Sequence, residues 1–144
     1  MGIIVYTGGT FDVPHVGHVN FLRQCKEYFP DSYLILGLNT DEFIEEFKGK
    51  KPIFSYEERK KLLETINYVD EIIPNTGGKD SKPAISIAKP DVIIIGSDWL
   101  KKDYLKQMDF TEEWLRDQHI ALIYIPYTDI ISTTEIKKRI RDAE

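Results

Sequence analysis

Residues 2–20 read GIIVYTGGTFDVPHVGHVN and hold the first structural unit of the chain. Residues 2–7 are a short, mostly β-branched run, which predicts a buried strand. A glycine pair and a short loop follow. The apolar residues of 16–29 then recur at helical spacing until Pro30 and Asp31 end the pattern. A strand that leads through a glycine turn into a helix is the opening of an α/β fold.

The remaining sequence repeats this unit about four more times. Further strands are predicted at 32–38, 71–73, 91–95 and 120–125. Helices are predicted at 40–47, 55–67, 83–88, 109–118 and 132–141, with loops at 48–54 and 75–82. Short apolar strands that alternate with helices predict one Rossmann-like α/β domain over residues 1–144. We expect a parallel five-stranded sheet with helices on both faces, and a ligand site beyond the carboxyl ends of the strands.

Composition and charge narrow the class of protein. The 144 residues are 42% hydrophobic and 30% charged, as in globular domains. No stretch approaches the roughly 20 apolar residues that cross a bilayer, so we expect no membrane insertion. The first residues do not read as a signal peptide, and the single cysteine, Cys25, fits a reducing cytoplasm. A net charge of −5 argues against nucleic-acid binding through an overall positive field.

Two of the three histidines, His15 and His18, stand at the start of the first helix with Gly17 between them. An ordinary strand-to-helix connection, a metal pair and a phosphate site are all open at this point. A zinc site needs more ligands than the distant His119 and a core cysteine supply, so no metal ligands are predicted. Free N–H groups at a helix start attract anions, and imidazoles donate to charged oxygens. The pattern therefore favours a phosphate site, although it matches neither a GxGxxG nor a Walker A loop.

The segment GGTFDVPHVGH at 8–18 resembles the signature of the small cytidylyltransferases, a family of the HxGH nucleotidyltransferases. The likeness continues through KGKKPIFSYEERKKLLETINYVDEIIP at 48–74, GSDW at 96–99 and ISTT at 131–134. It covers nearly the whole chain and is greatest for glycerol-3-phosphate cytidylyltransferases. The resemblance implies the HxGH nucleotidyltransferase fold. It also implies transfer of CMP from CTP to a small phosphorylated alcohol, such as glycerol 3-phosphate, with release of pyrophosphate.

The same resemblance assigns roles to residues. The catalytic residues would be the imidazole donors His15 and His18, together with Lys48 and Lys50, which would neutralise the leaving pyrophosphate. Binding of the nucleotide is expected from Gly8, Gly9, Thr10, Phe11, Asp12, Gly17, Asp98, Ser132, Thr133 and Thr134. Binding of the acceptor or a phosphate is expected from Arg59, Asp70 and Tyr127. Mg²⁺ would bind together with the nucleoside triphosphate. The protein is expected to form a homodimer.

Several of these residues have a structural alternative. Asp12 is expected to order its loop, and the lysines to lie in a mobile loop that is otherwise only a solvated basic segment. Residues 132–134 open the last helix, so they also suit a helix N-cap. Arg59 would hold a phosphate or pair with Glu57 or Asp70.

Two positions depart from the family pattern. Tyr127 and Asn67 stand where the family usually has arginine, whose planar guanidinium no neighbouring residue replaces by type. Two alternatives therefore stay open. One is an adenylyltransferase that uses ATP with a phosphorylated sugar or flavin-type acceptor, and the other is a nucleotide-binding module with little turnover.

Overall fold

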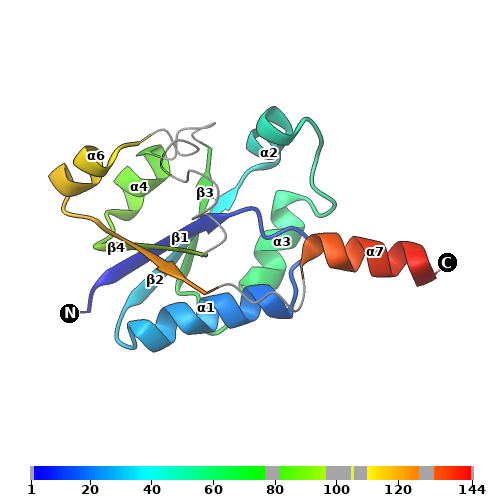
Figure 1. Ribbon diagram of the computed structural model, residues 1–144, viewed down its shortest axis with the longest axis horizontal. Coiled ribbons are helices and arrows are strands. Elements are labelled where there is room, and N and C mark those ends of the chain that lie inside the picture. The colour runs from blue at the N-terminus through cyan, green and yellow to red at the C-terminus, as the bar shows by residue number, and fades with distance from the viewer. Residues whose placement is uncertain (1, 77–81, 97–104, 106–109, 127–131, 144) are drawn as a thin grey trace.

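A computed structural model of the chain describes residues 2–76, 82–96, 105, 110–126 and 132–143 (Figure 1). Its sheet has five strands, all parallel, in the order β3-β2-β1-β4-β5. The strands are β1 (Ile4–Gly9), β2 (Tyr33–Asn39), β3 (Glu71–Asn75), β4 (Val92–Gly96) and β5 (Ala121–Ile125). The predicted parallel five-stranded sheet is confirmed. Chain order reverses beside β1, because β2 and β4 pair with its two edges.

Helices cover both faces of the sheet, as predicted (Figure 1). One face packs against α1 (Val16–Tyr28) and α3 (Tyr56–Leu63), and the other against α4 (Lys82–Ala88) and α6 (Glu112–Asp117). Each face of the sheet has its own hydrophobic core, and alternate residues of β2 contribute to the two cores. Leu34 and Leu36 lie in the core under α1 and α3, and Ile35 lies in the core under α4 and α6. Burial on both sides explains why the strands are near-continuous apolar runs.

Strand β1 extends further than predicted, since Gly8 and Gly9 belong to it and pair with Gly37 and Leu38 of β2. The glycines are therefore not a turn. They leave room for aromatic rings of the same chain, because a Cβ on Gly9 would lie 2.9 Å from the Phe11 ring. A side chain on Gly37 would collide with the Tyr6 hydroxyl. The turn into α1 begins only at residue 10.

Helix boundaries also differ from the prediction, most clearly in α2, α3 and α6. Helix α2 (Asp41–Lys48) includes Lys48, which was predicted in the following loop, and ends at Gly49 with a positive φ of 76°. Helix α3 ends at Leu63 instead of residue 67, and the residues after Leu63 form tight turns. Helix α6 starts at residue 112 because the Thr111 side chain caps it by accepting from the Trp114 N–H. Local capping chemistry, which hydrophobic periodicity does not report, sets these ends.

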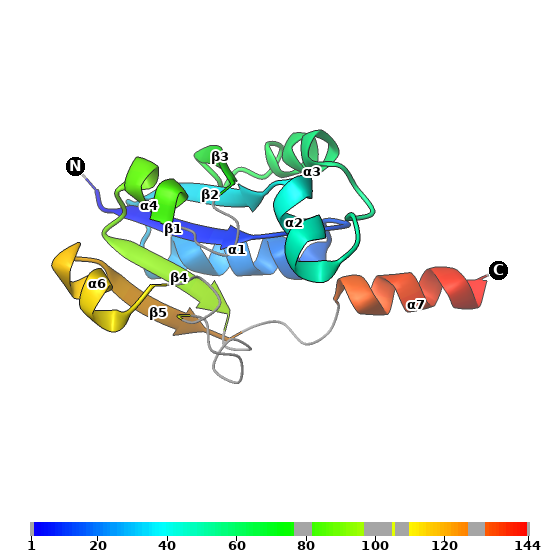
Figure 2. The ribbon, with the colours of Figure 1, turned by 90° about the horizontal axis from the view of Figure 1, so that it is seen from above.

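The last helix, α7 (Thr133–Ala143), extends away from the sheet, and none of its residues is buried (Figure 2). Ser132 caps it by accepting from the Glu135 N–H at 3.0 Å, as the N-cap alternative expected. Among the residues that the structure describes, no helix is long and apolar enough to cross a membrane.

Candidate functional site

The connection between β1 and α1 lies at the carboxyl end of the sheet, where chain order reverses. Ligands of open parallel sheets bind at such a reversal. Within this connection Phe11 and Val13 both have a φ of 48°. Left-handed backbone costs a residue with a side chain, and most of all a β-branched one, roughly 1–3 kcal/mol. Strain of this kind persists only where surrounding contacts hold the loop, and the loop around Asp12 has such contacts.

His15 and His18 stack on each other, with 3.8 Å between their ring centroids. The Nδ1 atom of His15 accepts from the Gly17 N–H at 3.0 Å, and Nδ1 of His18 accepts from the His15 N–H at 3.3 Å. Because each Nδ1 accepts, each neutral ring carries its proton on Nε2. The Nε2 atom of His15 is buried and has no hydrogen-bond partner in the described part of the chain. The site therefore contains a buried donor that a bound anion would satisfy.

Burial keeps both imidazoles neutral. It lowers the pKa of His15 from its ordinary value, and it lowers the pKa of His18 to about 3. The neighbouring His15 ring lowers the pKa of His18 further, whereas the Asp12 carboxylate raises it. At neutral pH the two rings are thus N–H donors without a net charge, and His18 keeps this form well below pH 6.

This depressed pKa predicts a pH-dependent stability. In the unfolded chain histidine titrates near 6.5, so the unfolded state binds more protons than the folded state between that pH and about 3. Stability is therefore lost as the pH falls through this window. We expect His18 to lower the free energy of unfolding by about 1.4 kcal/mol between pH 7.5 and 5.5. Urea unfolding at both pH values measures it. A His18→Gln variant with the same pH dependence as the wild type would contradict the assignment.

Asp12 joins three segments of the site. Its carboxylate accepts from the N–H groups of Ile53 at 2.8 Å and Phe54 at 2.9 Å, in the loop that carries Lys50. It also accepts from the Val13 N–H at 3.0 Å. Its carbonyl accepts from the Thr133 hydroxyl at 2.7 Å, which fixes the start of α7. Both carboxylate oxygens are engaged with backbone, so Asp12 orders the loop.

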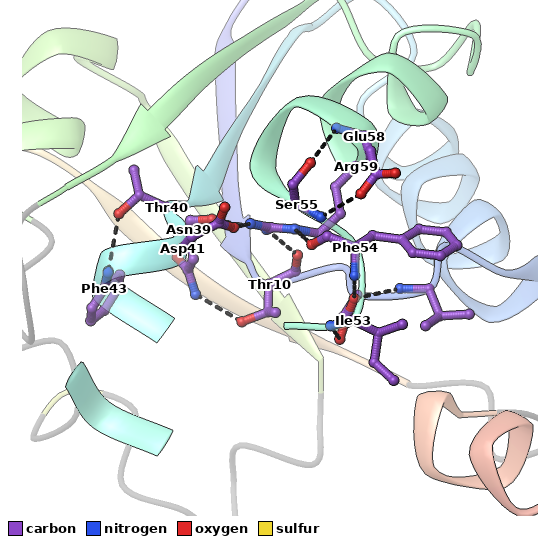
Figure 3. A network of polar contacts seen from close by, with 12 residues as sticks. Thr10, Asn39, Thr40, Asp41, Phe43, Ile53, Phe54, Ser55, Glu58 and Arg59 are labelled. Atoms are coloured by element: carbon purple, nitrogen blue, oxygen red, sulfur yellow. Dashed lines mark hydrogen bonds and ion pairs between the residues drawn. The ribbon is translucent and has the colours of Figure 1, made fainter. Parts of the chain in front are cut away.

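Arg59 lies fully buried beside this loop (Figure 3). Its guanidinium donates to the carbonyls of Phe54 at 3.0 Å and of Thr10 and Asn39 at 2.8 Å each. It also donates to the Asp41 carboxylate at 2.7 Å. Asp41 opens α2 directly after β2, which brings this carboxylate to the first turn of α3. Arg59 pairs with Asp41 and not with Glu57 or Asp70, so the alternative pairing predicted from the sequence is wrong. These four hydrogen bonds of the guanidinium all go to protein oxygens.

Asp70 lies at the other end of the sheet from the histidines. Its carboxylate pairs with Lys26 at 2.6 Å and accepts from the N–H of Leu34, at the start of β2. The site begins beyond Asn39, where the same strand ends. The structure therefore does not bring Asp70 to the site.

Two asparagines that were not predicted from the sequence lie at the carboxyl edge of the sheet, beside Thr10. The Asn39 amide donates to the Thr10 hydroxyl at 3.1 Å, and the Asn75 amide donates to the Asn39 oxygen at 3.0 Å. Each stands at the carboxyl end of its strand, β2 or β3. A polar residue in that position was a usable signal, because parallel strands end at one edge.

The other predicted residues are distributed as follows. Lys48 and Lys50 are exposed, and the Lys48 ammonium lies 5.6 Å from the centroid of the Phe47 ring. Thr133 touches the loop, whereas Thr134 is exposed. Asp98 and Tyr127 lie outside the described residues.

Within the described ranges, no three His, Cys, Asp or Glu side chains gather into a group that could hold a metal ion. Two carboxylates belong to this network. Asp12 accepts from backbone N–H groups, and Asp41 pairs with Arg59. A magnesium ion here would take most of its oxygen ligands from phosphate and water, as this ion does at nucleotide sites.

Known proteins resemble this chain in sequence and in structure. A model of the Cytidylyltransferase-like family matches residues 6–139. The chain is 43% identical to a glycerol-3-phosphate cytidylyltransferase of Bacillus subtilis, over 94% of this chain and 95% of the relative. It is 35% identical to an FAD synthase of Pyrococcus abyssi, over 97% and 93%. A lipopolysaccharide core biosynthesis protein of Thermoplasma volcanium is similar in structure, with a TM-score of 0.66 and 25% identity over 90% of this chain and all of that one.

Proposed function

Because this chain belongs to the cytidylyltransferase-like family, we propose that it transfers CMP from CTP to glycerol 3-phosphate. The products are CDP-glycerol and pyrophosphate. The observation that carries the proposal is the pair of neutral imidazoles at the start of α1, one of which has a buried Nε2 with no hydrogen-bond partner among the described residues. The glycerol-3-phosphate cytidylyltransferases, which are more similar to this chain than the FAD synthases are, supply the substrates.

In this reaction a phosphate oxygen of the acceptor attacks the α-phosphorus of CTP, and the bond to pyrophosphate breaks on the opposite side. Negative charge develops on the phosphate oxygens as the attack proceeds. Fixed N–H donors stabilise that charge without reorganising, and this positioning is most of what phosphoryl-type transfer requires. The stacked rings of His15 and His18, each held through Nδ1, are two such donors.

The cations and hydroxyls around the histidines support binding of a triphosphate. We propose that Lys48 and Lys50 approach the leaving pyrophosphate. Lys50 is exposed in the loop that Asp12 holds, and Lys48 is exposed at the end of α2, directly before that loop. Ser132, Thr133 and Thr134 would present the start of α7 to the same phosphates. Mg²⁺ would bind together with the triphosphate and supply positive charge to it.

We further propose that the protein works as a homodimer in the cytoplasm. The only cysteine, Cys25, is buried, and burial raises the pKa of its thiol to about 12. A buried, protonated thiol with no disulfide partner suits a reducing compartment. Sedimentation analysis tests the dimer.

The function is tested by pyrophosphate release in the presence of Mg²⁺. The four nucleoside triphosphates are each combined with glycerol 3-phosphate, other phosphorylated polyols, a phosphorylated sugar and FMN. We expect turnover with CTP and glycerol 3-phosphate. Turnover confined to ATP with FMN or the sugar would establish the adenylyltransferase alternative, because FAD synthases are also among the relatives. Tight binding of nucleotide without turnover of any pair would establish a nucleotide-binding module.

A further inference from the structure

A row of three polar side chains crosses the carboxyl edge of the sheet. Asn75 ends β3, Asn39 ends β2 opposite to it in the register, and Thr10 directly follows β1. The two asparagines are buried, with 2% and 7% of their surfaces exposed, whereas Thr10 is only half-buried. The row thus runs from the interior of the protein to the start of the connection between β1 and α1.

The hydrogen bonds of this row have one direction. The Asn75 Nδ2 atom donates to Oδ1 of Asn39, and the Asn39 Nδ2 atom donates to Oγ1 of Thr10. A threonine hydroxyl has one proton, and here the protein uses one of its acceptor lone pairs. The Thr10 hydroxyl therefore does not donate into the row, and its proton stays available to an acceptor outside it.

Arg59 holds the last two members of the row in place. The same nitrogen, Nη1, donates to the carbonyls of Thr10 and Asn39, at 2.8 Å each (Figure 3). The two residues are thus joined through both their main chains and their side chains. A hydroxyl held in this way keeps its direction before any ligand arrives, which is the property of a preorganised donor.

We propose that this row fixes the Thr10 hydroxyl as a third neutral donor to the triphosphate, with Asn39 and Asn75 as positioning residues. Phosphate oxygens only accept hydrogen bonds from the protein, so a hydroxyl held as a donor favours them. Thr10 begins the connection that ends at His15, the N-cap of α1, and His18 lies in the first turn of that helix, so we assign all three donors to one site. The inference rests on the proposed function for the identity of its ligand.

The test reverses the direction of the hydrogen bonds in the row. Asn75→Asp offers only acceptors to Asn39, so the Asn39 amide turns its Nδ2 toward Asp and its Oδ1 toward Thr10. The Thr10 hydroxyl then donates into the protein. We expect kcat/KM for CTP to fall roughly 10- to 100-fold, the effect of losing a hydrogen bond to a charged group. The KM for glycerol 3-phosphate should stay within about 2-fold of the wild type.

A double-mutant cycle with Thr10→Val separates this role from a general effect on the fold. Thr10→Val should reproduce the loss, Thr10→Ser should retain most activity, and Asn75→Asp should change nothing further when Val stands at position 10. Additive losses would overturn the proposal. So would wild-type kcat/KM in Asn75→Asp.

Thr40→Asp is the matched control for charge, because it adds a carboxylate beside Asn39 and keeps a side chain able to cap α2. A loss in this variant as large as in Asn75→Asp would also overturn the proposal. If Asn75→Asp does not fold, as judged by thermal denaturation, Asn75→Leu replaces it in the cycle. If the wild type uses another nucleotide, or only binds one, the same cycle is measured on that reaction or on its Kd. A result that contradicts the positioning role of the row can therefore be distinguished from a result that contradicts the proposed function.

Discussion

The variant His18→Ala is expected to lower kcat by roughly 10²- to 10⁴-fold, the usual effect of removing a group that acts directly on the transition state. His18 is 8% exposed, its ring is stacked on His15, and its Nδ1 fixes the direction of the remaining N–H. Loss of the ring removes one donor and also frees His15 to turn. The loss should therefore appear mainly in kcat, with a smaller change in the KM for CTP.

Steady-state pyrophosphate release with saturating CTP and glycerol 3-phosphate measures this effect. Thermal denaturation of the same preparation shows whether the domain is still folded. His119→Asn is the matched control, because His119 is exposed and Asn tolerates its positive φ of 59°. A kcat within about 3-fold of the wild type in folded His18→Ala would remove this imidazole from the chemistry.

Replacement of Arg59 by methionine is expected to lower the free energy of unfolding by about 3–5 kcal/mol. Methionine keeps an unbranched, apolar side chain of similar length but donates no hydrogen bond. The carbonyls of Thr10, Asn39 and Phe54 and the carboxylate of Asp41 then lose their common partner. Acceptors without a donor are costly in a buried or partly buried place, and several are left without this donor at once.

Urea unfolding measures the loss, and Arg139→Met is the matched control. Arg139 lies 3.4 Å from Glu135 in an exposed pair one turn apart on α7. Such pairs contribute less than about 1 kcal/mol, so this variant should unfold almost as the wild type does. Equal losses in the two arginine variants would show that Arg59 is not the centre of the network. Activity of Arg59→Met should fall as well, since the loop between β1 and α1 loses an anchor.

The fold could be predicted from the sequence because each strand and helix carries its own local pattern. The alternation of apolar runs with helical periodicity indicated the parallel sheet, and His15 and His18 marked the loop beside β1. The limits of α3 and α6 were less accurate, since they depend on single capping and turn contacts such as that of Thr111.

The partners of buried polar groups could not be predicted in this way. Arg59 is eighteen residues from Asp41 and forty-nine from Thr10, so which carboxylate it meets depends on how α2, α3 and β1 pack. The contact between Asn39 and Asn75 depends on strand register, and their residue type alone does not predict it. Asp12 illustrates the intermediate case. Its ordering role was predicted, but the backbone groups of Ile53 and Phe54 that it binds were not.

The central place of β1 in the sheet has a consequence for how the chain acquires its structure. β1 obtains its first neighbour, β2, after one helix, but its second, β4, only after most of the chain has followed. Ile4 and Asp91 form two hydrogen bonds of 2.8 Å where β4 joins, across 87 residues. Such distant closures make folding slow, and they leave an apolar strand edge open during synthesis. The strand that leads into the site is thus the first to be made and among the last to be enclosed.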